Sequence, residues 1–150
     1  GYNSGAGHHP RVLFIGFGET DEFAHEGRYD LYLQQAKQFD HFLEQLWNQI
    51  QRDPFYRNKT TMFVTTDHGR GKGPAQWTKH GWRVAGSGET WMMQIGPAVK
   101  PSGEIRMKAE IFNEQFAQTI AYLLGETFNA AHPVESKLSL VFSDMSASQE

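Results

Sequence analysis

The sequence predicts a mixed α/β domain, built on a partial, doubly wound and mostly parallel sheet with flanking helices. Three observations favour this class: two short strand-forming runs, a long amphipathic helix between them, and polar residues where both runs end. A strand, a helix of about six turns and a second strand make a βαβ unit. We therefore expect the two strands to be parallel and their crossover to be right-handed.

The first predicted strand is Arg11–Phe17, a continuous apolar run with the length of a strand buried on both faces. A long helix is predicted over Gly27–Gln51, because apolar side chains recur there every three or four positions. The pair Asp53-Pro54 should end this helix. The second strand is Thr60–Thr66, which is rich in β-branched and aromatic residues.

A long loop follows the second strand. It runs from Asp67 to Gly88, contains six Gly and shows no clear periodicity. Long loops in compact domains are usually functional or disordered. Two tryptophans, Trp77 and Trp82, argue against disorder and are expected to anchor the loop. The remaining predicted elements are a strand at Glu89–Gly96, a helix at Glu114–Leu124 followed by Gly125, and a last strand at Leu138–Phe142.

Composition sets the broad class of the protein. The 150 residues, of which 39% are hydrophobic, suffice for one domain, with residues 1–10 and 143–150 as flexible ends. A net charge of -3 gives no basic surface for nucleic acid, and no apolar run approaches the roughly 20 residues that span a bilayer. The absence of Cys fits an exported protein as well as a cytosolic one, so the compartment stays open, with an extracytoplasmic one slightly favoured.

Polar side chains with metal-binding chemistry follow both predicted strands. Asp21 and His25 come after the first strand, Asp67 and His68 after the second, and His80 lies in the long loop. The carboxyl ends of parallel strands meet at one edge of a sheet, so we expect these groups to converge. Three His and two Asp suit zinc, with manganese as the nearest competitor. Five ligands allow one closed site, or two metals with some ligands missing.

Simpler roles exist for each of these residues. A single His is more often structural than a ligand, and Asp21 or Asp67 can serve as a helix or loop cap. The residue chemistry therefore leaves open a small α/β domain with a structural zinc site. The joint pattern favours a metal site because two strand ends carry Asp and His independently.

The order of these motifs resembles the C-terminal half of an alkaline phosphatase superfamily enzyme. This superfamily includes phosphodiesterases, sulfatases and cofactor-independent phosphoglycerate mutases. The matching motifs are Asp21-x-x-x-His25, Thr66-Asp67-His68-Gly69, His80-Gly81, Gly88-Glu89 and the segment Met92–Pro97.

The resemblance implies a hydrolase of phosphate or sulfate esters that uses two zinc ions. By analogy Asp21, His25 and His80 would hold one metal, and Asp67 and His68 the other. The family acts through a covalent intermediate on a Ser or Thr, but no position here matches that nucleophile. We therefore expect this chain to be the C-terminal portion of a larger hydrolase domain, inactive by itself and binding one metal weakly or not at all.

Further residues are candidates for contact with a small anionic ester. Arg70 and Lys72 lie in a basic, Gly-rich stretch, and Lys79 precedes His80. Glu89 follows the loop, where its carboxylate could accept a hydrogen bond from a metal ligand and so orient it. The choice between phosphate and sulfate, and between monoester and diester, stays open. A non-catalytic relative that keeps the fold as a binding module is the alternative. We also expect an exposed sheet edge that favours self-association.

Overall fold

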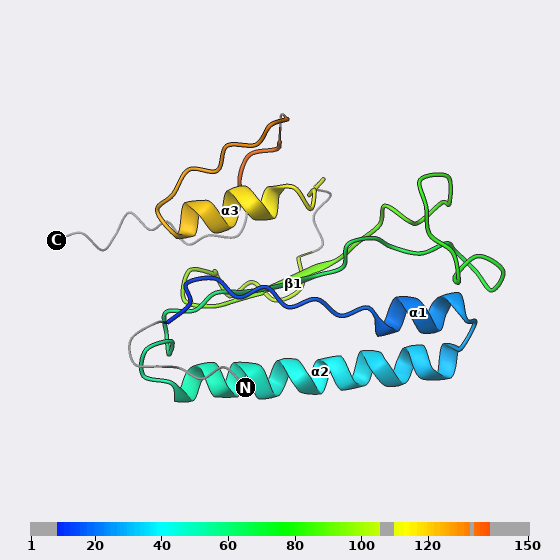
Figure 1. The fold of residues 1–150 in the computed structure, drawn as a ribbon, viewed down its shortest axis with the longest axis horizontal. Helices are drawn as coiled ribbons and strands as arrows, with labels where there is room; N and C mark the ends of the chain where they lie inside the picture. Colours follow the sequence, from blue (N-terminus) through cyan, green and yellow to red (C-terminus); the bar gives the residue numbers. More distant parts are fainter. Residues whose placement is uncertain (1–8, 106–109, 133, 139–150) are drawn as a thin grey trace. The chain divides into compact units, whose positions relative to one another are not determined.

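A computed structural model describes residues 9–105, 110–132 and 134–138 of the chain. They belong to two compact units, one of residues 1–17 with 111–138 and the other of residues 18–110 with 139–150. Three helices and two strands lie within the described residues (Figure 1), which confirms the mixed α/β content. The elements are α1 (Glu19–His25), α2 (Tyr29–Arg52), β1 (Met62–Thr65), β2 (Met92–Ile95) and α3 (Gln115–Leu123).

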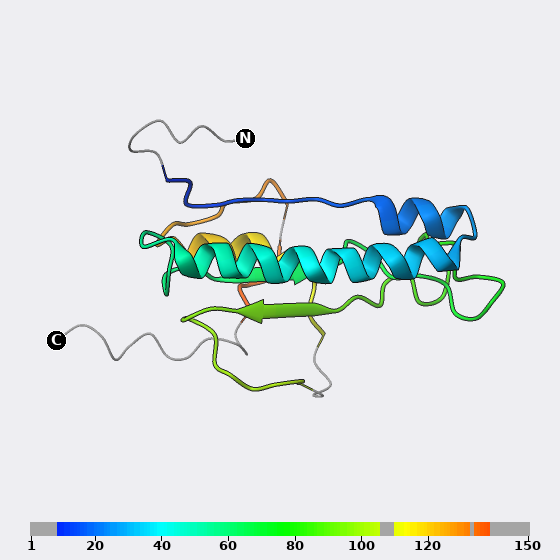
Figure 2. The ribbon, with the colours of Figure 1, turned by 90° about the horizontal axis from the view of Figure 1, so that it is seen from below.

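The helices of the second unit lie side by side. Gly27 adopts a φ of 71°, a left-handed conformation that favours glycine, and reverses the chain between α1 and α2. As a result α1 packs along the first turns of α2 (Figures 1 and 2), and Ala24 on α1 is completely buried. The predicted long helix is confirmed, with its end at Arg52 and an extended Asp53 before Pro54.

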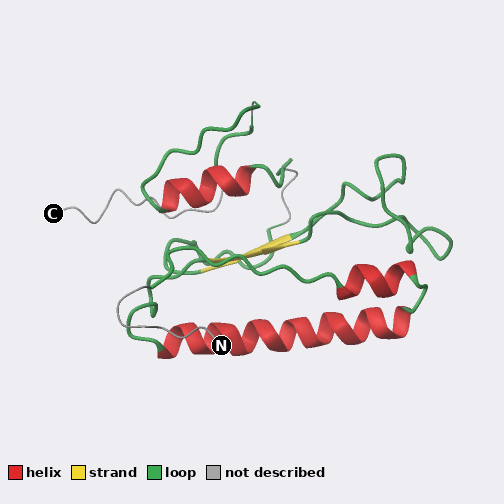
Figure 3. Cartoon of the chain, viewed as in Figure 1, coloured by secondary structure: helices red, strands yellow, loops and turns green. Residues whose placement is uncertain are grey.

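The sheet differs from the prediction. Strands β1 and β2 pair in antiparallel fashion, with Met62 opposite Ile95 and Thr65 opposite Met92. The sequence predicted a mostly parallel sheet, whereas the two strands of the described residues are antiparallel and are joined by a loop instead of a crossover helix (Figure 3). A chain that returns without a crossover helix brings its second strand back antiparallel. The strand prediction at Glu89–Gly96 is confirmed in its central part.

The first predicted strand is not formed. Residues 11–17 have no strand conformation, and Phe14 is 91% exposed. Apolar character alone does not make a strand, which exists only where its N–H and C=O groups pair with a neighbouring strand. The βαβ unit expected from this run is therefore absent from the described residues.

The first unit contains α3. Its buried Thr119 donates its hydroxyl to the carbonyl of Gln115 (2.7 Å) and accepts the N–H of Leu138 (3.0 Å). Arg11 Nη2 donates to the carbonyl of Leu124 (2.9 Å), and Gly125 takes the left-handed conformation predicted for the end of the helix, with φ 73°. Residues 139–142 of the predicted last strand and the predicted flexible ends at 1–8 and 143–150 lie outside the described residues.

The described part of the chain contains no helix that could cross a membrane. None of its helices combines the length and the apolar character that a bilayer crossing requires.

An exposed ion pair at the start of α2 gives the first testable prediction. Arg28 donates from Nε to Asp30 Oδ1 (3.0 Å) and from Nη2 to Oδ2 (2.7 Å). This pairing lowers the pKa of Asp30 from 3.8 to about 2. A carboxyl whose pKa is lower in the folded state stabilises the fold above its unfolded pKa and loses this contribution as the pH falls.

We therefore expect Asp30→Asn to lower the thermal unfolding midpoint slightly at neutral pH, because the pair is solvent-exposed. The difference from wild type should shrink as the pH falls from about 4 towards about 2, where the wild-type carboxyl also becomes protonated. Circular dichroism melts at several pH values measure this. A difference that stays constant down to the lowest pH would contradict the assignment.

Candidate metal centre

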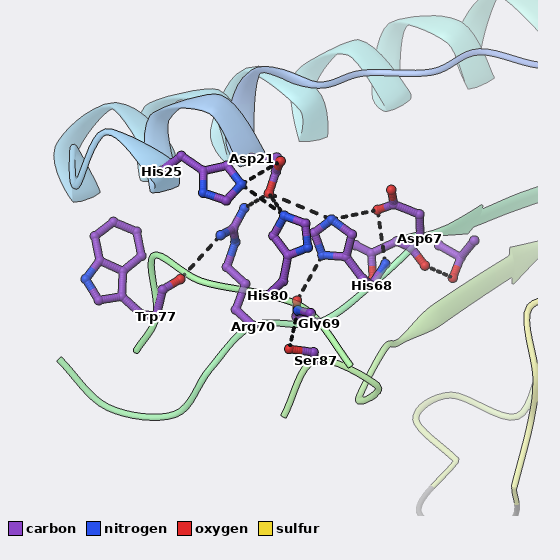
Figure 4. Close-up of polar contacts among 12 residues, drawn as sticks. Asp21, His25, Asp67, His68, Gly69, Arg70, Trp77, His80 and Ser87 are labelled. Carbon is purple, nitrogen blue, oxygen red and sulfur yellow. Dashed lines mark hydrogen bonds and ion pairs between the residues drawn. The ribbon is translucent and has the colours of Figure 1, made fainter. Parts of the chain in front are cut away.

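Asp21 is the shared acceptor of the site. Helix α1 places Asp21 and His25 one turn apart on the same face, as their four-residue spacing predicts, and His25 Nε2 lies 3.3 Å from Asp21 Oδ2. The other carboxylate oxygen, Oδ1, faces the loop after β1. There it lies 3.5 Å from His80 Nε2 and 3.8 Å from His68 Nε2 (Figure 4).

The two loop histidines are stacked against each other. The ring centroids of His68 and His80 are 3.7 Å apart and their planes are inclined by 11°. Asp21, His68 and His80 each present one donor atom, and these three atoms lie within 4.8 Å of one another. All three side chains are partly buried. The convergence expected from the sequence is therefore present, although it is not built on parallel strands.

The hydrogen bonding of His68 leaves one ring nitrogen available as a ligand. Its Nδ1 lies 2.9 Å from the carbonyl oxygen of Gly69, which can only accept, so Nδ1 carries the proton. In the neutral ring Nε2 is then the unprotonated nitrogen, and this is the atom that faces Asp21. Such a bond to a backbone carbonyl typically orients metal-ligating histidines.

His25 extends the donor set. Its Nε2 lies 2.9 Å from His80 Nε2, so only one of the two nitrogens can carry a proton in this contact. Four donors at about 2.0–2.1 Å from a tetrahedral zinc lie roughly 3.3 Å from one another. His25 Nε2 lies 2.9 Å from His80 Nε2 and 3.3 Å from Asp21 Oδ2, whereas His80 Nε2 lies 3.5 Å from the other oxygen, Asp21 Oδ1, so the two histidines approach different oxygens of the carboxylate. The residues thus fit a borderline divalent cation such as zinc in their chemistry, and Asp21, His68 and His80 each offer a donor atom within 4.8 Å of the others.

Asp67 lies at the outer side of the site. Its side chain is 88% exposed, and Oδ1 is 3.7 Å from His68 Nε2. The same oxygen accepts the backbone N–H of His68 at 3.0 Å. His68 thus stands between Asp67 and Asp21, and its Nε2 is within 4 Å of both carboxylates.

Arg70 contacts the carboxylate at the centre of the donor set. Its Nη2 donates to Asp21 Oδ1, and its Nη1 donates to the carbonyl of Trp77 (3.3 Å). The Arg70 side chain is only 16% exposed, and its guanidinium carbon lies 5.9 Å from the centroid of the Tyr32 ring. The sequence nominated Arg70 for an anionic substrate, but here it holds an acid of the protein itself.

Backbone hydrogen bonds fold the loop after β1 back on itself. Gly69 donates to the carbonyl of Ser87 (2.7 Å), and Gly71 donates to the carbonyl of Lys79 (3.0 Å). The hydroxyl of Ser87 accepts the N–H of Gly81 (3.1 Å) beside His80. Ser87 positions both loop histidines, yet a serine between two glycines gives no sequence signal for this role.

The other nominated residues have different surroundings. Lys72 Nζ lies 2.7 Å from Glu89 Oε1 in an exposed pair, so these two predicted residues contact each other. Lys79 contributes its backbone carbonyl to the loop, and its side chain is exposed. Trp77 packs edge-on against Tyr29 at 5.3 Å, which confirms its predicted anchoring role. Trp82 does not anchor the loop, because it is 86% exposed.

A hollow opens beside the donor atoms. It has a volume of about 320 Å³ and offers room for a small ligand next to His68 and His80. Its lining consists of His68, His80, Gly81, Trp82, Val84, Ser87 and Gly88.

A protein-family model described as the Metalloenzyme superfamily matches residues 6–84, which is more than half of the chain. The match covers α1, α2, β1 and all five predicted ligands, and it confirms the resemblance drawn from the motifs. No curated protein and no solved structure gave a match.

The packing around Gly69 gives a second testable prediction. A Cβ at this position would lie 2.3 Å from the carbonyl oxygens of both Gly86 and Glu89, so Gly69→Ala must displace backbone next to His68. We expect a loss of about 1–3 kcal/mol in the free energy of unfolding, as for other overpacked sites. Chemical denaturation measures it.

Gly88→Ala is the matched control, because a Cβ there meets no atom within 4 Å. It should leave the free energy of unfolding nearly unchanged. Equal effects of the two substitutions would show that the close approach at Gly69 does not support the loop.

Proposed function

The chain belongs to the Metalloenzyme superfamily, and from this premise we propose that it forms part of a metal-dependent hydrolase of phosphate or sulfate esters. The observation that carries the proposal is the convergence of Asp21, His68 and His80 within 4.8 Å. One carboxylate and two imidazoles form a ligand set typical of zinc enzymes.

The ligand assignment follows the family pattern. Asp21, His25 and His80 would hold one zinc, Asp67 and His68 would contribute to a second, and manganese is the alternative metal. Bound there, the metals would act as Lewis acids that lower the pKa of oxygen nucleophiles and attract charge from the ester oxygens. The short contacts among Asp21, His25 and His80 support the first group, and the position of His68 between Asp67 and Asp21 supports a second site adjoining it.

The protein's own groups prepare this chemistry in two ways. The bond from His68 Nδ1 to the Gly69 carbonyl fixes the ring so that Nε2 faces the donor set. The hollow beside His68 and His80 provides space for a small anionic ester at the donor atoms. Because His68 and His80 line this hollow, an ester bound in it would have its reacting group next to both histidines.

The nucleophile is proposed to lie in a part of the enzyme outside these 150 residues. The family pattern places a Ser or Thr at the start of a helix that follows a strand, and within the described ranges no residue has that setting. Hydrolysis would then proceed through a covalent ester on that residue. The chain described here would supply metal ligands and part of the substrate site.

An ester substrate would add negative charge at a site that already holds basic groups. Arg70 is tied to Asp21, Lys72 forms an exposed pair with Glu89, and Lys79 is exposed in the same loop. The side chains of Lys72 and Lys79 are exposed and therefore accessible to an anion. We infer that they contribute to attraction of the substrate more than to its fixed positioning.

A purely structural zinc site is the main alternative. Structural sites are closed by four protein ligands, whereas catalytic sites keep a position open. The hollow that borders His68 and His80 favours an open site.

Zinc titration of the purified chain gives the third prediction. We expect the chain to bind about one equivalent of zinc weakly, and His80→Asn to weaken this binding further, by more than the roughly 10–100-fold typical of a change at a residue that only supports a ligand. Isothermal titration calorimetry at about pH 7.5, above the ordinary pKa of a free imidazole, measures both values. His41→Asn is the matched control, since His41 pairs with Glu44 on the exposed side of α2. An equal loss in both variants would remove His80 from the ligand set.

The hydrolase itself is tested with the complete enzyme. We expect zinc-dependent release of nitrophenol from p-nitrophenyl phosphate, its bis ester or p-nitrophenyl sulfate, and loss of this release in Asp21→Asn. The substrate that turns over distinguishes the possible branches. Absence of zinc-dependent turnover on all three compounds would refute the hydrolase proposal.

A further inference from the structure

Arg70 and a metal ion require the same atom of Asp21. Within the donor set, Asp21 faces both His68 and His80 through Oδ1, and Arg70 Nη2 donates to this same oxygen. Figure 4 shows the guanidinium of Arg70 and the ring of His80 approaching Asp21 from the loop. A cation bound to Oδ1 and to His80 would therefore be placed beside a second positive charge.

The position of Arg70 is built into the fold. Its side chain is 16% exposed, Nη1 donates to the Trp77 carbonyl, and the guanidinium carbon lies 5.9 Å from the Tyr32 ring centroid. Trp77 in turn packs against Tyr29 and Tyr32 of α2. A side chain with these contacts is not an exposed arginine that meets a carboxylate by chance, and its charge is less screened than one at the surface.

We propose that Arg70 is a competing counter-ion for Asp21, which a divalent cation must displace from Oδ1 in order to bind. This inference rests on the proposed metal centre. The exchange replaces one positive charge with another at the same carboxylate. The binding free energy of the metal is therefore reduced by the free energy of the Arg70–Asp21 ion pair that must be broken. The displaced guanidinium keeps the Trp77 carbonyl and the Tyr32 ring as neighbours and so remains beside the donor set.

The opposite role for Arg70 makes the opposite prediction. Outer-shell partners of ligating carboxylates commonly hold the ligand in place, and their removal weakens metal binding. A competitor, by contrast, strengthens metal binding when it is removed. The sign of the change in zinc affinity therefore decides between the two roles.

The experiment compares zinc dissociation constants of wild type, Arg70→Met and Arg70→Lys by competition with a chromophoric chelator. Charge-assisted hydrogen bonds are strong enough that Arg70→Met should bind zinc roughly tenfold or more tightly. Arg70→Lys should show a smaller gain, because a lysine retains the charge without the planar donors of arginine. If Arg70→Met does not fold, the direction of the Arg70→Lys change decides the test.

A matched control is Arg28→Met. It also removes an arginine that pairs with an aspartate, but Asp30 is not part of the donor set. Its zinc affinity should stay within about twofold of wild type, a change too small to reflect a lost ion pair. A similar gain in Arg28→Met would mean that net charge alone is responsible, and this would overturn the proposal.

Two failures can be distinguished. If wild type binds zinc and Arg70→Met binds it equally or more weakly, the competing role of Arg70 is wrong and the metal centre stands. If neither wild type nor any Arg70 variant binds zinc, the metal centre fails and the inference with it. A thermal unfolding scan adds a second readout, in which zinc should raise the unfolding midpoint of Arg70→Met more than that of wild type.

Discussion

The carboxylate of Asp21 is the constraint on which the site depends. A carboxylate that is only partly exposed needs positive or hydrogen-bonding neighbours. Here it has His25 on one oxygen and Arg70, His68 and His80 around the other. Three of these four groups come from the loop after β1, so one acid on α1 gathers three side chains of the loop. A change of charge at Asp21 therefore alters the electrostatic interactions of all four groups.

The supports of the site lie outside the donor set. Helix α1 is only two turns long, and its packing along α2 fixes the direction in which Asp21 and His25 point. The loop has no regular structure, but the backbone bonds at Gly69 and Gly71 and the Ser87 hydroxyl hold it together. Rigid geometry at a loop site thus comes from tight glycine contacts and from aromatic packing of Trp77 on α2.

The chemistry of the site was easier to predict than the fold that carries it. Asp21 and His25 could be placed on one face because helical spacing is local information, and the long helix followed from its apolar period. The antiparallel pairing of β1 with β2 could not be predicted, since strand partners depend on contacts far apart in sequence. The run at residues 11–17 looked like a buried strand, yet its side chains are exposed. The roles of Ser87 and Arg70 could not be predicted, because they depend on hydrogen bonds to Gly69, Gly81 and Asp21 that only the folded chain shows.

The contacts of Asp21 and His25 with the loop also connect segments that are far apart in the sequence. Arg70 meets Asp21 across 49 residues, and His25 meets His80 across 55. Bringing such distant positions together costs about 3.5 kcal/mol of loop-closure entropy beyond a length-independent term. A sequence without cysteine has no disulfide to offset this cost. The polar contacts of Asp21 and His25 offset part of this cost instead. The same side chains that prepare the site for a ligand therefore also contribute to the stability of the contact between the loop and the helices.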